Sequence, residues 1–170
     1  MQTKFYSIKL FLIALLLSLG MATKTNAQFA QVDMDPPFNL TKGGVNVPAS
    51  PGDILQYVIR TTNLTTADLV ASKFYNSVPE GTTYVTGSTS LNGWSIPDVN
   101  GKMPYIGGGY INSISNTTGR ISPGAFAKVS YQLKVTASSG EIRNQAAVDV
   151  TSGGVSDIDR SNIVSTPVVP

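Results

Sequence analysis

The sequence contains neither cysteine nor histidine, and only 13% of its 170 residues are charged. Without these two residue types the chain cannot build a histidine-dependent catalytic triad, a thiol nucleophile or the common zinc sites. The lack of cysteine also excludes a disulfide framework, so the stability of the fold has to come from packing. An enzyme made from this chain would depend on carboxylates, hydroxyls or lysine. We therefore expect no catalysis and no cofactor.

The apolar run in residues 11–23 is shorter than the roughly 20 apolar residues that a membrane-spanning helix needs. It follows Lys4 and Lys9 and precedes Ala27. A basic start, a short apolar stretch and a small residue at the end are typical of a secretory signal peptide, here with cleavage after Ala27. No cysteine follows the run, which excludes a lipid-anchored lipoprotein. We expect a secreted, extracellular or cell-surface protein with no membrane span in the mature chain.

The net charge of the chain changes once this leader is removed. Three of the twelve Lys and Arg residues precede Gln28, whereas all ten Asp and Glu residues follow it, so the mature chain carries 9 − 10 = −1. There is no overall basic surplus to attract nucleic acid or anionic lipid. The remaining 143 residues (170 − 27) suffice for one domain with its own core.

Several short segments alternate between apolar and polar side chains. In residues 126–136 the apolar face holds Ala127, Val129, Tyr131, Leu133 and Val135. This period of two is typical of half-buried antiparallel strands. A second alternating run, residues 141–151, follows a turn at 137–140, and we expect the two runs to pair as the last well-defined strands.

Other strands are predicted at 53–62, 69–78, 82–88 and 162–166, with an irregular stretch at 91–118. About seven to nine short strands favour an all-β, antiparallel immunoglobulin-like β-sandwich, preceded by a cleavable signal-peptide helix. The predicted organisation is a signal peptide (1–27), an N-terminal segment (28–44), the immunoglobulin-like domain (45–155) and a C-terminal edge strand or tail (156–170).

Four short motifs occur in a fixed order between residues 45 and 151. Their residues are Gly52, Asp53, Tyr57 and Asn63; Pro79, Gly81, Tyr84 and Val85; Pro123, Gly124 and Val129; and Asn144, Ala146 and Val148. In this order the motifs resemble the bacterial conserved-repeat surface module known as domain of unknown function eleven. The resemblance implies a non-catalytic, immunoglobulin-like module of a bacterial surface protein, with Asp53, Tyr57, Asn63 and Asn144 as structural residues. The long stretch 91–119 and the single copy depart from the family.

Two acidic pairs lie outside these motifs: Asp33 with Asp35, and Asp157 with Asp159. Alternating Asp residues near carbonyl groups could ligate Ca²⁺, a hard cation that prefers oxygen. The plainer interpretation is that they are solvated turn carboxylates, and we assign no metal site. Asn144 shares a strand face with Ile142 and Val148, so we expect a buried amide that needs hydrogen-bond partners. A Lys–Asn isopeptide cross-link is the alternative role for Asn144.

Aromatic residues in the irregular stretch form the candidate ligand surface: Trp94, Tyr105 and Tyr110. They could contact another envelope or extracellular protein or stack on a polysaccharide. Alternatively, Trp94 fills the sandwich core. The function predicted first is a non-catalytic structural or interaction module of envelope or adhesin type. A carbohydrate-binding module using these aromatics is second, and a secreted carboxylate-dependent hydrolase is third.

Overall fold

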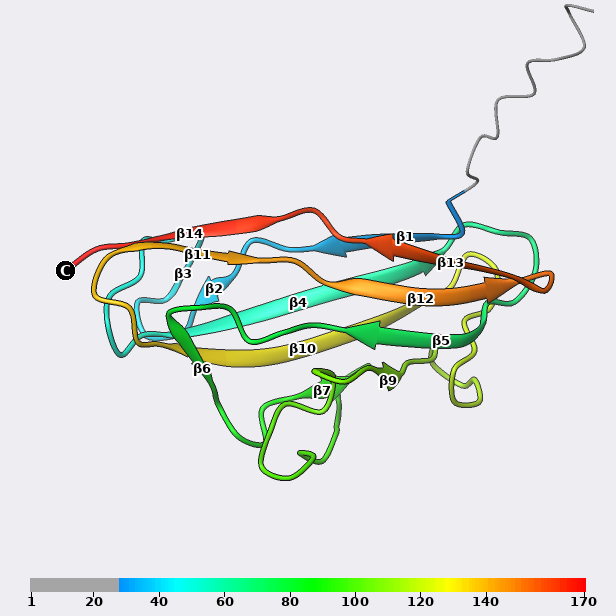
Figure 1. Ribbon diagram of the computed structural model, residues 1–170, viewed down its shortest axis with the longest axis horizontal. Coiled ribbons are helices and arrows are strands. Elements are labelled where there is room, and N and C mark those ends of the chain that lie inside the picture. Colours follow the sequence, from blue (N-terminus) through cyan, green and yellow to red (C-terminus); the bar gives the residue numbers. More distant parts are fainter. Residues whose placement is uncertain (1–27) are drawn as a thin grey trace, which may run out of the picture.

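Two layers of antiparallel strands face each other across one apolar core (Figure 1). The computed structural model describes residues 28–170, and the predicted signal-peptide helix lies outside this range. The described chain begins at one end of the long axis and ends at the other (Figure 1). Within it, no helix is long and apolar enough to cross a membrane. The predicted all-β, immunoglobulin-like sandwich is confirmed.

The first layer is built on two ten-residue strands, β4 (Ile54–Asn63) and β10 (Phe126–Val135), which pair along almost their whole length. On the far side of β4 lie β1 (Ala30–Met34) and β2 (Phe38–Asn39), and β2 also pairs with β3 (Gly44–Val45). On the far side of β10 lie β6 (Thr82–Tyr84) and the hairpin of β7 (Ser90–Leu91) with β8 (Trp94–Ser95). Both edges of β10 are therefore occupied.

The second layer covers the other side of the core. One part has the strand order β13 (Val155–Arg160), β12 (Ala147–Ser152), β5 (Val70–Tyr75) and β9 (Gly109–Tyr110). The other part pairs β11 (Gly140–Asn144) with β14 (Val164–Val168). The described residues form fourteen strands, more than the seven to nine that the sequence predicted, and five of them have only two residues.

The alternation predicted for the two long strands is confirmed by their burial. All odd-numbered residues of β4 and β10 from Leu55 to Asn63 and from Ala127 to Val135 are buried, and the even-numbered ones face outward. Tyr57 and Tyr131 lie opposite each other and stack at 5.6 Å between ring centroids. Apolar burial of this kind contributes roughly 25 cal/mol per Å², which makes this face the main source of stability in a chain without disulfides.

The predicted pairing of residues 126–136 with residues 141–151 is wrong. β10 pairs with β4, β6 and β7, whereas β11 pairs with β14 in the opposite layer. The reason is that β10 has no free edge, so the connection at residues 137–139 crosses the core to the second layer. A local alternation fixes which face of a strand is buried, but not its neighbour.

The second run is also divided, and it is not the last of the chain. Its residues form β11 and β12 with a break at Gln145–Ala146, where the Asn76 side chain and Ser161 provide hydrogen bonds to the backbone. Two further strands, β13 and β14, follow where the sequence predicted one. β1 and β14 bring the terminal segments 28–44 and 156–170 into the same sandwich as residues 45–155.

Candidate interaction surface

Trp94 projects into solvent from the edge of the first layer. It belongs to β8, the outermost strand of that layer, and 79% of its surface is exposed. Its cross-strand partner Leu91 is the buried apolar residue of this hairpin. The alternative in which Trp94 fills the core is therefore wrong, because its side chain is exposed on the outermost strand of the layer.

The two tyrosines of the irregular stretch have different environments. Tyr105 is only 2% exposed and contacts Phe74 edge to face at 5.2 Å, and burial raises the pKa of its phenol to about 12. This corrects the expectation that Tyr105 lies on the ligand surface. Tyr110 is 48% exposed, and the Lys73 ammonium lies 5.1 Å from its ring centroid. Exposed apolar side chains of the same stretch are Val99, Ile106 and Ile114.

Side-chain hydrogen bonds hold the loops that carry these residues. The Tyr84 hydroxyl donates to Asp98 Oδ1 at 2.7 Å, and Asp98 Oδ2 accepts from Gly87 N at 2.9 Å. Asn92, in the β7–β8 turn, donates to the carbonyl of Asn112 at 2.7 Å, which ties this hairpin to the chain just after β9 (Figure 1). Loops that are already held by hydrogen bonds would lose less conformational entropy on binding another molecule.

Asp159, a member of the second acidic pair, holds the N-terminal strand together with Asn162. Asp159 is buried, and its Oδ2 accepts the backbone N–H of Ala30 at 2.8 Å. Burial raises the pKa of this carboxyl, and the nearby Asp157 raises it further. Asn162 brackets Met34, donating to its carbonyl at 3.0 Å and accepting its N–H at 2.9 Å. These side chains satisfy the edge of β1 that β4 leaves unpaired.

The members of the other acidic pair lie at the surface. Asp33 is half-buried and accepts from Gln31 at 3.2 Å, and Asp35 is exposed. Within residues 28–170 no group of three or more His, Cys, Asp and Glu side chains is arranged to hold a metal ion.

Asp53 and Asn63 fix the two ends of β4. Asp53 Oδ2 accepts from Asn39 Nδ2 at 2.8 Å and from Ser50 N at 2.9 Å, and the Lys42 ammonium lies 3.3 Å away. Although burial on its own raises the pKa of Asp53, these hydrogen bonds and the Lys42 charge outweigh it and hold the pKa below 3.8. The motif residues thus secure turns and strand ends.

We expect Asp53 to shape the acid limb of the stability curve. Because the folded-state pKa of Asp53 is lowered, the ionised carboxylate stabilises the fold when the pH is above 3.8. This contribution is lost as the pH falls through the lowered pKa. Urea unfolding at a series of pH values that spans 3.8 should show a steeper acid loss in the native chain than in Asp53→Asn. Equal slopes in the two proteins would contradict this assignment.

Asn144 belongs to a closed ring of three buried side chains. Asn144 Nδ2 donates to the Tyr131 hydroxyl at 2.7 Å, this hydroxyl donates to Asn76 Oδ1 at 2.9 Å, and Asn76 Nδ2 donates to Asn144 Oδ1 at 3.0 Å. The ring contains no lysine, which an isopeptide bond to Asn144 would need. Asn76 was not identified from the sequence, although it shares the inward parity of Ser72 and Phe74 in β5.

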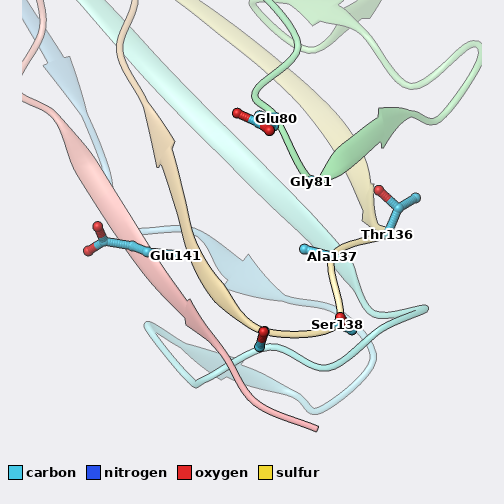
Figure 2. A pocket seen from close by; sticks show the side chains of 7 residues that line it. Glu80, Gly81, Thr136, Ala137, Ser138 and Glu141 are labelled. Carbon is cyan, nitrogen blue, oxygen red and sulfur yellow. The ribbon is translucent and has the colours of Figure 1, made fainter.

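A polar pocket of about 480 Å³ opens where the chain crosses between the layers (Figure 2). It is lined by Glu80, Gly81, Thr136, Ala137, Ser138, Ser139 and Glu141. Glu141 accepts a hydrogen bond from Ser165, and the guanidinium of Arg143 lies 3.9 Å from its carboxylate. The sequence analysis did not single out these residues. Their carboxylates and hydroxyls can hydrogen-bond a polar ligand, but the pocket contains no cation of its own.

Strand order, layering and the single apolar core define an immunoglobulin-like β-sandwich, with the exposed Trp94 and Tyr110 on the edge strands β8 and β9. No protein-family model matches the sequence, and no curated protein is significantly similar to it. The full-length major pilin SpaD of Corynebacterium diphtheriae is similar in structure, with a TM-score of 0.52 and 12% identity over 81% of this chain and 34% of the pilin.

A second Corynebacterium diphtheriae protein, described as membrane anchored, has a TM-score of 0.51 and 14% identity over 86% of this chain and 37% of its own length. The present chain therefore spans about a third of the length of these two proteins. The CARDB domain of PF1109 from Pyrococcus furiosus gives a TM-score of 0.44 at 14% identity, over 83% of this chain and 94% of that domain. At these identities the similarity establishes the fold alone.

Proposed function

We propose that this chain is an exported, non-catalytic interaction module of the bacterial cell surface or extracellular space. The observation that carries the proposal is the placement of Trp94, which is 79% exposed on the β7–β8 edge hairpin, whose turn is hydrogen-bonded to Asn112. Large aromatic side chains are favoured anchors at protein interfaces because they bury much area at small entropic cost. The partner is another envelope or extracellular protein.

Two further points support this role. The leader predicted in residues 1–27 directs the chain out of the cytoplasm. We also propose that the chain is one copy of the conserved-repeat surface module, because the structure gives physical roles to the residues that carry the resemblance. Asp53, Asn63 and Asn144 are buried and hydrogen-bonded, and Tyr57 is buried in the core.

Trp94→Ala tests the proposal. We expect it to abolish capture of the partner from a native envelope extract and to change the free energy of unfolding by less than about 0.5 kcal/mol, since the side chain is exposed. Val45→Ala is the matched control, because Val45 is 60% exposed on β3, on the opposite edge of the same layer. Undiminished capture by Trp94→Ala would refute this role for the β7–β8 edge hairpin.

A carbohydrate-binding module is the second candidate, favoured by the exposure of both Trp94 and Tyr110. Sugar rings stack on such exposed aromatic faces. Retention of the native chain in a gel containing a neutral polysaccharide, lost in both Trp94→Ala and Tyr110→Ala, would favour this candidate over a protein partner.

A further inference from the structure

The outer face of the first layer carries three cations that form no ion pair with any group in residues 28–170. Arg60 on β4 and Lys128 and Lys134 on β10 all occupy outward positions. The ion pairs within 4.0 Å among residues 28–170 involve Lys42, Arg120 and Arg143. The guanidinium of Arg60 instead lies over the Phe126 ring, at 5.0 Å from its centroid.

Two of these cations lie directly opposite each other. In the β4–β10 register Lys128 is the partner of Arg60, and on the other side of Arg60 the β1 partner is Asp33. Like charges at directly opposed strand positions destabilise a sheet. The single carboxylate of Asp33 offsets only one of these two cations, so the face keeps a net positive charge at this point.

This face differs in charge from the rest of the molecule. Residues 28–170 hold nine cations and ten carboxylates, yet the outward positions of β1, β4, β7 and β10 hold three cations and one carboxylate, a balance of 3 − 1 = +2. Lys128 and Lys134 are six residues apart on one strand, or about 20 Å. The face is thus a sparse row of positive charge on a protein that is otherwise acidic.

Uncharged hydrogen-bonding side chains lie between the cations. Gln56 and Gln132 are opposite each other, and the Ser90 and Ser130 hydroxyls are 2.7 Å apart. Amides and hydroxyls both donate and accept, so they match the hydroxyl groups of a sugar chain. β4 and β10 run side by side through the middle of the molecule, so this face can follow a linear polymer (Figure 1).

We infer that the outer face of β4 and β10 binds an anionic polysaccharide, with Arg60, Lys128 and Lys134 contacting its acidic groups and the glutamines and serines its hydroxyls. The charge spacing favours this occupant over nucleic acid, because a duplex carries one charge per about 1.7 Å. The small number of cations also favours an anionic polysaccharide over a membrane surface, for which clusters of about four to eight basic residues are typical. The inference takes only its extracellular setting from the proposed function and concerns a different surface from Trp94.

The test is affinity electrophoresis of the purified protein in gels containing polygalacturonate, heparin or neutral dextran. We expect retention by at least one of the anionic polymers at low salt, decreasing as salt is added. The triple variant Arg60→Gln/Lys128→Gln/Lys134→Gln should bind about 3- to 100-fold more weakly, since each exposed ion pair accounts for about 1.4- to 5-fold. The charge-matched control Lys102→Gln/Arg143→Gln/Arg160→Gln should keep most of the affinity, because these residues lie on loops or on the second layer.

A second readout separates binding from folding. Because Lys128 opposes Arg60, Lys128→Gln should raise the melting temperature by about 1–4 °C while it weakens retention. The inference is overturned by equal retention in dextran, by no retention in either anionic polymer, by stronger binding to duplex DNA or anionic vesicles, or by a triple variant that binds like the native chain. Trp94→Ala should leave this retention unchanged. A loss of retention in Trp94→Ala would assign the polysaccharide to the β7–β8 edge hairpin instead.

Discussion

Replacing Tyr131 with phenylalanine is expected to lower the free energy of unfolding by about 2–4 kcal/mol, because it leaves two buried polar groups without partners. Asn144 Nδ2 loses its acceptor and Asn76 Oδ1 loses its donor, both in the interior between the layers. Burial raises the pKa of Tyr131 far above its ordinary value, so the phenol is protonated and able to donate at any physiological pH. Urea denaturation followed by circular dichroism measures the loss.

Tyr57 provides the matched control for this substitution. Its ring stacks on Tyr131 with an interplanar angle of 17°, and both side chains are fully buried. Its hydroxyl lies near Thr166 but makes no hydrogen bond of ordinary geometry with any group in residues 28–170. Tyr57→Phe removes the same atom from the same stack, and we expect it to be neutral or stabilising. Equal losses in the two variants would show that the ring of amides and phenol contributes nothing specific.

Replacing Asn63 with alanine is expected to cost about 2–4 kcal/mol, because one buried side chain closes the turn after β4 with four hydrogen bonds. Its Nδ2 donates to the carbonyls of Ala67 and Ile121, both at 2.8 Å, and its Oδ1 accepts from the backbone N–H and the hydroxyl of Thr65. Without the amide, the buried carbonyl of Ile121 loses this donor, and the carbonyl of Ala67 keeps only the Thr65 hydroxyl. The free energy of unfolding in urea is again the measurement.

Gln56→Ala is the control for Asn63→Ala. Gln56 lies on the same strand but faces outward, and a surface substitution of this kind usually changes stability by less than about 0.5 kcal/mol. If Asn63→Ala loses no more than Gln56→Ala, the turn after β4 does not depend on its amide. A large loss confined to Asn63 supports the view that this motif residue is structural.

The sequence alone was sufficient to predict which residues of the two long strands face the core. The alternation in residues 53–62 and 126–136 follows from pleat geometry, which is local, and every buried position of β4 and β10 agrees with it. The same parity placed Asn144 inside, as the structure has it. Asn76 also has inward parity, but it follows β5, a shorter and less regular strand, and the sequence analysis did not identify it as buried.

The positions of the aromatics depended on tertiary structure. Trp94 and Tyr105 occur in the same irregular stretch, with no periodicity to separate them, yet one is 79% and the other 2% exposed. Trp94 lies on β8, the outermost strand of the first layer, whereas Tyr105 packs against Phe74 of β5. Such contacts join residues far apart in the chain.

By itself, then, the sequence determined the class of fold and which side of each long strand is buried, because side-chain alternation and turn residues act over a few neighbouring positions. Only the tertiary structure decided which strands are neighbours, since β4 occupies one edge of β10, β6 and β7 occupy the other, and β11 pairs with β14. It also decided where charge gathers. Arg60 and Lys128 are 68 residues apart in sequence (128 − 60), and strand register alone brings them face to face.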